Sequence, residues 1–205
     1  IIHDIVNTVQ QWKETGKDRH SLLKQLSDIW GLYIPAFYQP VYAANGKIEK
    51  ILKLEESVPE IIKKRFIPEL LPGPQKPIVP SVDVVHNRIA VEIMRGCSRG
   101  CRFCHAGAVN RPIREKSVDQ IINTIENALE NTGYEEVSLL SLSSSDYSYI
   151  LELVDTLSQK FEGKNLTISL PSLRIESLSI DLLEKLKTGR KSGFTIAPEA
   201  ASERM

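Results

Sequence analysis

From residue 88 onward the sequence alternates between short apolar segments and longer segments with helical periodicity, and this alternation restricts the fold more than any other feature. The strand-like segments are RIAVEIMRG (88–96), EEVSLLSLSSS (135–145), NLTISLPSL (165–173) and GFTIAPEA (193–200). Between them, apolar residues recur at helical spacing, as at Ile121, Ile122 and Ile125. Such alternation predicts an α/β fold with parallel strands and helices on the outer face of the sheet.

The first part of the chain follows a different pattern. Helical spacing is found in residues 2–12 and 22–30, Asn45-Gly46 predicts a hairpin turn, and residues 58–66 are compatible with a short helix. We therefore expect a small helical and hairpin segment ahead of the parallel strands. Residues 68–81 contain five of the eleven prolines of the chain, which predicts a stiff, extended linker.

The composition argues against several functional classes. The net charge is zero, from 26 basic and 26 acidic residues, so the overall charge gives no sign of a nucleic-acid partner. No apolar run approaches the roughly 20 residues of a membrane span, and no signal peptide is visible. Three cysteines without a pairing pattern suit a reducing compartment. We expect a cytoplasmic protein without a membrane partner and, because no Met begins the chain, a fragment of a longer polypeptide.

All three cysteines lie in MRGCSRGCRFCHAG, at Cys97, Cys101 and Cys104. Thiolates hold iron–sulfur clusters, and three of them on a 4Fe–4S cluster leave one iron open to a small molecule. The alternatives are a disulfide with one spare thiol, a Cys₃His zinc site that recruits His105, and three structural cysteines. Gly96 and Gly100 would let the loop curl so that the sulfurs converge.

Other polar residues follow the remaining predicted strands. They are Ser143, Ser144, Ser145 and Asp146 at the end of the second strand, Ser172 and Arg174 at the end of the third, and Glu199 at the end of the fourth. Ligands of parallel sheets collect at the carboxyl ends of the strands, so these residues and the cysteines are predicted to share one edge. The competing interpretations are that Asp146 caps the next helix and that Arg174 is an ordinary surface residue.

The Cys-x-x-x-Cys-x-x-Cys spacing after the first strand of a βα repeat, with the aromatic Phe103 before the last cysteine, resembles the radical S-adenosylmethionine (SAM) superfamily over about residues 82–205. The resemblance implies a 4Fe–4S cluster on Cys97, Cys101 and Cys104. It also implies that SAM binds the open iron and is cleaved to a 5′-deoxyadenosyl radical, with electrons from a flavodoxin- or ferredoxin-type donor.

The same resemblance assigns roles to the other strand ends. Ser143 and Ser144 occupy the place of the Gly-Gly-Glu-like stretch that receives the SAM amino group. Ser172 becomes a ribose contact and Arg174 a carboxylate contact, while Phe103 and Glu199 face the cofactor or substrate cavity. Ala201 replaces a Gly that related enzymes have near this point.

The most similar group consists of uncharacterised bacterial radical SAM proteins with an N-terminal cobalamin-binding-type domain. On this resemblance, residues 1–67 are the tail of that region, 68–81 the linker, and 82–205 the first part of a radical SAM (β/α) barrel, cut after about its fourth strand. Cobalamin becomes a candidate cofactor of the full-length protein. Methylthiolation, methylation and other radical modifications of an unknown substrate, RNA or protein among the candidates, are all open on this resemblance.

A second hypothesis is a zinc-stabilised Cys₃His module that binds RNA or protein. Its binding surface would use the arginines around the cysteines, which could instead shield a cluster or form a solvated basic face. These arginines are Arg95, Arg99, Arg102, Arg111 and Arg114.

Overall fold

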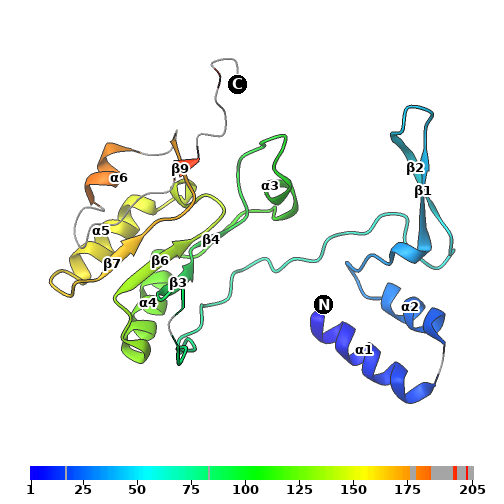
Figure 1. Cartoon of the computed structure of the whole chain (residues 1–205), viewed down its shortest axis with the longest axis horizontal. Coiled ribbons are helices and arrows are strands. Elements are labelled where there is room, and N and C mark those ends of the chain that lie inside the picture. Colours follow the sequence, from blue (N-terminus) through cyan, green and yellow to red (C-terminus); the bar gives the residue numbers. More distant parts are fainter. Residues whose placement is uncertain (17, 83, 176–178, 186–195, 198–201, 203–205) are drawn as a thin grey trace. The chain divides into compact units, whose positions relative to one another are not determined.

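Three short parallel strands form the centre of the region that follows residue 88 (Figure 1). They are β3 (Ile89–Glu92), β6 (Glu136–Leu140) and β7 (Thr167–Ser169), paired in the order β3-β6-β7. The structure, a computed structural model, describes the whole chain except residues 17, 83, 176–178, 186–195, 198–201 and 203–205. The predicted parallel α/β arrangement is confirmed.

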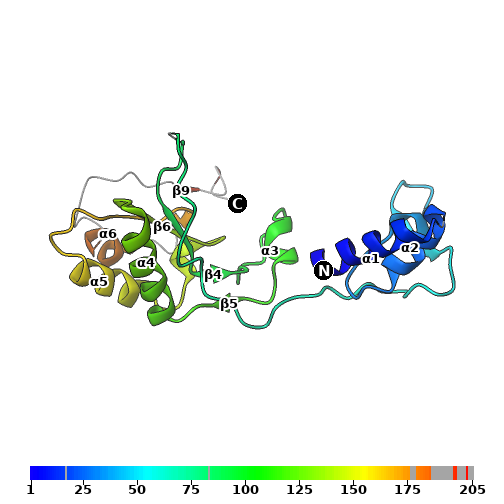
Figure 2. The ribbon, with the colours of Figure 1, turned by 90° about the horizontal axis from the view of Figure 1, so that it is seen from below.

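Two amphipathic helices join these strands. α4 (Val118–Thr132) begins at a capping box, in which the Ser117 and Gln120 side chains bond each other's backbone N–H groups. It ends at Gly133, which has a φ of 68°. α5 (Ile150–Lys160) joins β6 to β7. Figure 2 shows α4 and α5 beside the shorter α6 (Ile180–Lys185).

One hydrophobic core holds the strands to the helices. Val91, Val137 and Leu139 contribute from β3 and β6, and Ile121 and Leu153 are among the contributors from α4 and α5. Each of these side chains is at most 2% exposed. Burial of a full aliphatic side chain stabilises a fold by roughly 1.5–3 kcal/mol, so this core fixes the strand ends from which the polar loops emerge.

Several predicted strands are shorter than the apolar segments that suggested them. Residues 88–96 form β3 and then β4 (Met94–Arg95), which pairs antiparallel with β5 (Arg114–Glu115). Residues 165–173 contain β7 and the start of β8 (Leu173–Arg174), and β8 pairs in parallel with β9 (Ile196–Ala197). The β4–β5 ribbon was not predicted, because two-residue strands carry no periodicity.

The chain divides into two compact units, Ile1–Ile67 and Pro68–Met205. The first contains the helices α1 (Ile2–Thr15) and α2 (Arg19–Ser27), the 3₁₀ turn η1 (Pro35–Phe37), and a hairpin of β1 (Tyr38–Tyr42) and β2 (Ile48–Lys53). Ile34, Phe37, Tyr38 and Val58 form its small core. The hairpin prediction is confirmed, whereas the helix expected over residues 58–66 is absent.

The proline-rich segment belongs to the second unit, and one part of it contacts α4. A Cβ atom at Gly73 would lie 2.7 Å from Cγ2 of Thr124 on α4, so the backbone touches this helix there. Between residues 68 and 88 the described part of the segment contains no helix or strand. Among the described helices of the chain, none has both the length and the apolar character needed to cross a membrane.

Candidate functional site

The three cysteines lie in one loop at the carboxyl end of β3. We define the cysteine loop as residues 96–113, which leave the sheet through β4 and return through β5. Met94 pairs with Glu115 and Arg95 with Arg114, so the two ends of the loop are held side by side. Ile93 N–H also donates to Leu140 O at 3.0 Å, which ties the base of the loop to β6.

Cys97, Cys101 and Cys104 are all free thiols and all partly buried, so none is used in a disulfide. The Cys104 N–H donates to Cys101 O at 3.0 Å, and its Sγ accepts from the Gly107 N–H at 3.4 Å as α3 (His105–Val109) begins. Within the described residues no three His, Cys, Asp or Glu side chains form a metal-binding group. The predicted convergence of the three sulfurs is therefore not seen.

Gly96 closes the loop at its neck. Its φ is 100°, and an added Cβ would lie 2.8 Å from Asn110 O and 3.0 Å from both Pro112 O and Ile113 Cα. The outgoing and returning backbones are thus in direct contact, and only glycine fits this crossing without strain. The backbone freedom predicted for Gly96 is confirmed, although its use is a close approach of two chain segments.

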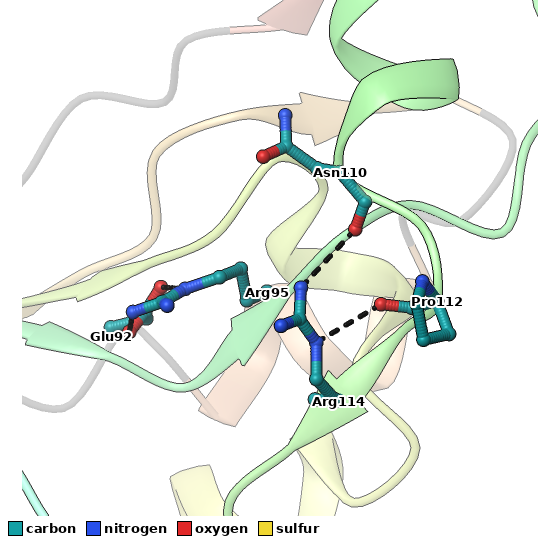
Figure 3. A network of polar contacts seen from close by, with 5 residues as sticks. All are labelled: Glu92, Arg95, Asn110, Pro112 and Arg114. Carbon is teal, nitrogen blue, oxygen red and sulfur yellow. Dashed lines mark hydrogen bonds and ion pairs between the residues drawn. The ribbon is translucent and has the colours of Figure 1, made fainter. Parts of the chain in front are cut away.

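Two arginines bind groups at the same neck (Figure 3). Arg114 donates to Pro112 O at 3.1 Å and to Asn110 O at 3.4 Å, which satisfies carbonyls at the end of the loop. Arg95 grips both carboxylate oxygens of Glu92 at 2.7 Å. The hydrogen bonds from Arg95 hold the pKa of Glu92 below its usual range, although partial burial opposes them.

The end of β6 is a buried polar turn. Ser143 and Ser144 are at most 1% exposed, and Ser144 begins the 3₁₀ turn η2 (Ser144–Asp146). The Ser144 hydroxyl donates to Leu139 O at 3.0 Å, and the Ser143 hydroxyl donates to Asp146 Oδ2 at 2.8 Å. The Ser144 hydroxyl oxygen also accepts from the Ser141 hydroxyl at 3.2 Å, and the Ser143 and Ser144 carbonyls accept from the N–H groups of Asp146 and Tyr147. A ligand at this turn would share these oxygens with the protein, because each can accept a second hydrogen bond.

Asp146 also binds the cysteine loop. Arg99 Nη2 lies 2.7 Å from Asp146 Oδ1, and Arg99 Nε lies 3.1 Å from Oδ2. These hydrogen bonds are the main cause of the lowered pKa of Asp146, with Ser143 adding to it and burial opposing it. The helix-cap interpretation of Asp146 is wrong, because α5 has Tyr149 at its N-cap position. The signal available in the sequence was a pair of opposite charges on two loops predicted to share one edge.

The end of β7 meets the same turn. Ser144 N–H donates to Ser172 O at 3.3 Å, and Arg174 N–H reaches the Ser145 hydroxyl at 3.5 Å. Ser172 has a φ of 61°, which a non-glycine residue adopts only at some cost in energy. The charge of Arg174 lowers the pKa of Asp146, so its guanidinium lies within electrostatic reach of that carboxylate. The predicted gathering of strands one to three at one edge is thereby confirmed.

The remaining predicted residues are placed as follows. Phe103 is 72% exposed on the cysteine loop, and His105 is exposed at the start of α3. Glu199 lies outside the described residues, as does Ala201. The roles assigned to the cysteines, Phe103 and the strand-end residues stay predictions.

The arginines around the cysteines are neither a uniform solvated face nor a set of free ligand-binding groups. Four of the five bind protein groups, and these are Arg95, Arg99, Arg111 and Arg114. Arg102 is exposed. An open hollow of about 580 Å³ lies beside Cys97 and is lined by Ser98, Arg111, Pro112 and Ile113. A group bound through Cys97 would therefore have room and positive charge next to it.

Comparison with known proteins adds an independent finding. Residues 91–205 match the family model described as the radical SAM superfamily. An uncharacterised protein of Methanocaldococcus jannaschii is 39% identical over 115 residues, which cover 56% of this chain and 24% of that protein.

Two named enzymes are also similar. The tRNA-2-methylthio-N(6)-dimethylallyladenosine synthase of Parabacteroides distasonis is 33% identical over 49% of this chain and 19% of the enzyme. The ribosomal protein uS12 methylthiotransferase RimO of Prochlorococcus marinus is 26% identical over 63% of this chain and 26% of the enzyme. The chain thus spans only about a quarter of the length of the curated relatives it matches.

Proposed function

Because this chain belongs to the radical SAM superfamily, we propose that Cys97, Cys101 and Cys104 hold a 4Fe–4S cluster and that the shared carboxyl edge of the strands binds S-adenosylmethionine. The observation that carries the proposal is the match of residues 91–205 to this family, with three free thiols in a loop at that edge. The chain is accordingly part of an enzyme.

The donor set fits the cluster. Thiolates are the protein ligands of 4Fe–4S clusters, and a set of three leaves one iron for another molecule. All three thiols are accessible to iron, and the hollow beside Cys97 gives room for it. Metal ligands often gather only when the metal binds, so the separate sulfurs of this structure are expected to close around the cluster.

When bound, the cluster supplies the electron that cleaves S-adenosylmethionine to methionine and a 5′-deoxyadenosyl radical. The protein residues position the two groups. The backbone and hydroxyl oxygens of Ser143 and Ser144 are proposed to accept from the SAM ammonium group. Arg174 carries the charge suited to its carboxylate. Ser172, exposed after β7, is proposed to contact the ribose, and Phe103 and Glu199 to face the cofactor or substrate.

The substrate and reaction of the whole protein are inferred from relatives. The relatives named above act on tRNA and on a ribosomal protein, so we propose radical modification of an RNA or protein, by methylthiolation or methylation. Methylthiolation needs sulfur from a second site, and all three cysteines of this chain are committed to the first. A flavodoxin- or ferredoxin-type protein is the proposed electron donor, and a reducing cytoplasm is the proposed location.

The proposed domain arrangement follows the predicted boundaries. Residues 1–67 are assigned to a cobalamin-binding-type region and its connector, 68–81 to a linker, and 82–205 to a radical SAM barrel. The structural division between Ile67 and Pro68 supports the first of these boundaries, and it includes residues 68–81 in the second unit. Cobalamin is a proposed cofactor of the full-length protein only.

Metal analysis after anaerobic reconstitution with iron and sulfide tests the proposal. The chain should bind about four iron and four sulfide per molecule, and Cys97→Ala, Cys101→Ala and Cys104→Ala should each lose the cluster. Ser98→Ala, which alters the exposed neighbour of Cys97, is the matched control and should keep it. Stoichiometric zinc without iron, or a cluster that survives Cys101→Ala, would contradict the ligand assignment.

A further inference from the structure

The cysteine loop is attached to the rest of the fold at a second point, beyond its neck. Arg99 lies between Cys97 and Cys101 and makes two parallel hydrogen bonds to Asp146, at 2.7 and 3.1 Å. Paired bonds of this kind fix the orientation of both partners as well as their distance. Asp146 follows β6, and 47 residues of sequence separate it from Arg99.

Asp146 is held in place from its own side. Its side chain is 8% exposed, and its Oδ2 accepts from the hydroxyl of Ser143, which is itself 1% exposed. Ser143 is the N-cap residue of η2 and Asp146 is its last residue, so both belong to one short turn. The Asp146 carboxylate is thus held in one position by its surroundings. The Arg99 side chain, on the cysteine loop, is 42% exposed.

The backbone of Arg99 is also held. Arg111, on the returning arm of the cysteine loop, donates from Nη2 to Arg99 O at 2.9 Å. Arg99 therefore joins three segments, which are the outgoing arm, the returning arm and the end of β6. Cys97 lies between this junction and the Gly96 neck, and Cys101 lies two residues beyond it.

We propose that Arg99 and Asp146 form a clamp that positions the cysteine loop at the carboxyl end of β6 before any cofactor binds. Neither residue is a thiolate ligand of the proposed cluster, and we assign both as positioning residues. The clamp itself, which restricts the motion of the cysteine loop, does not depend on the proposed function. Its effect on the rate of cluster assembly rests on the proposed function. Other attachments of the loop between Gly96 and Cys104 are its neck, the turn around Cys104 and the bond from Arg111 to Arg99 O, and all of these lie within the cysteine loop itself.

Hydrogen–deuterium exchange of the metal-free chain tests the clamp directly. In Asp146→Asn the charge is lost and the size is kept, so amides of residues 98–104 should exchange about tenfold faster while the urea midpoint stays close to that of the wild type. Arg99→Lys keeps the charge but not the paired bonds, and should raise the rate by only about threefold.

Glu136→Gln is the matched control. It removes the carboxylate of an ion pair at the start of β6, where Arg88 Nη1 lies 2.8 Å from Glu136 Oε1. This substitution should leave exchange in the cysteine loop unchanged. Should Asp146→Asn fold poorly, Arg99→Gln breaks the same contact from the exposed side. Unchanged loop exchange in Arg99→Gln, or an equal rise in α4 and α5, would overturn the clamp.

Cluster assembly separates this proposal from the preceding one. If the clamp positions the ligands, Asp146→Asn should take up iron several-fold more slowly than Glu136→Gln under the same anaerobic conditions. If Asp146→Asn shows faster loop exchange but neither the wild type nor any variant binds iron, the clamp is upheld and the cluster is refuted. If Asp146→Asn shows the loop exchange of the wild type and both proteins bind the cluster, the clamp is refuted and the cluster is upheld.

Discussion

At the scale of single residues, Gly96 has little room for any side chain. Gly96→Ala would place a methyl group 2.8–3.0 Å from three backbone atoms and force a side chain into a left-handed conformation. The free energy of unfolding should fall by about 2–5 kcal/mol. Urea unfolding measures this loss.

Gly100→Ala is the control for this substitution. The nearest atom to its added Cβ is the flexible end of Arg111, at 4.0 Å, so the free energy of unfolding should change by less than about 0.5 kcal/mol. Equal effects of the two substitutions would contradict the close approach of the backbones at the neck.

Tyr147 links the start of α4 to the end of β6, and its ionisation makes stability depend on pH. It is 2% exposed, its hydroxyl donates to Lys116 O at 2.8 Å, and burial raises its pKa to about 12. Tyr147→Phe should cost about 1 kcal/mol at pH 7. The unfolded chain ionises near pH 10 and the folded chain only near pH 12, so the stability that the wild type owes to neutral Tyr147 is lost as pH rises across this range.

The difference between wild type and Tyr147→Phe should therefore shrink above pH 10, as urea unfolding at pH 7, 9, 10 and 11 would detect. Tyr149→Phe is the control, because Tyr149 is 53% exposed, and its effect should stay small throughout. A difference between wild type and Tyr147→Phe that stays constant to pH 11 would refute the raised pKa.

At the scale of elements, α4 depends on its first turn. Ser117→Ala removes the hydroxyl that accepts from the Gln120 N–H at 3.2 Å, and should lower the free energy of unfolding by about 1 kcal/mol. Ser117→Asp supplies another oxygen at the same position and should recover most of this loss. If alanine and aspartate were equivalent in thermal unfolding, the capping box would not stabilise the fold.

The elements also show what the sequence could predict. Ser117, Gln120 and Gly133 mark the ends of α4 correctly, because a cap depends on residues within one turn. The helix expected over residues 58–66 does not form, and Val58 instead belongs to the core of the first unit. Its apolar spacing suited a helix, but tertiary packing decided otherwise.

The candidate site was predictable where it depends on topology. The cysteines, the serines after β6 and Arg174 were expected at one edge, because the carboxyl ends of parallel strands meet there. The pairing of Arg99 with Asp146 was missed, since their opposite charges made a contact possible but local patterns could not select which residues of the two loops would pair. The sequence also predicted that the three cysteine sulfurs converge, whereas the described residues form no metal-binding group. The spacing of the cysteines places them in one loop but does not determine how their side chains are oriented.

At the scale of the whole molecule, the second unit assembles one polar edge from loops that are distant in sequence. Backbone and side-chain hydrogen bonds join the cysteine loop to the end of β6, and the end of β6 to the end of β7. α4 and α5 pack against the strands through the hydrophobic core and so fix the strand positions (Figure 2). Such an edge is suited to hold a cofactor and a second molecule beside it.

The central claim is that three thiolates hold a cluster whose fourth iron binds S-adenosylmethionine. The most direct test is electron–nuclear double resonance of the reduced, reconstituted protein, with S-adenosylmethionine labelled in turn with ¹⁵N in the amino group and ¹⁷O in the carboxylate. The account predicts hyperfine coupling of both labels to the cluster, and loss of the signal in Cys101→Ala. A reduced cluster that shows no coupling to either label at saturating S-adenosylmethionine would contradict it.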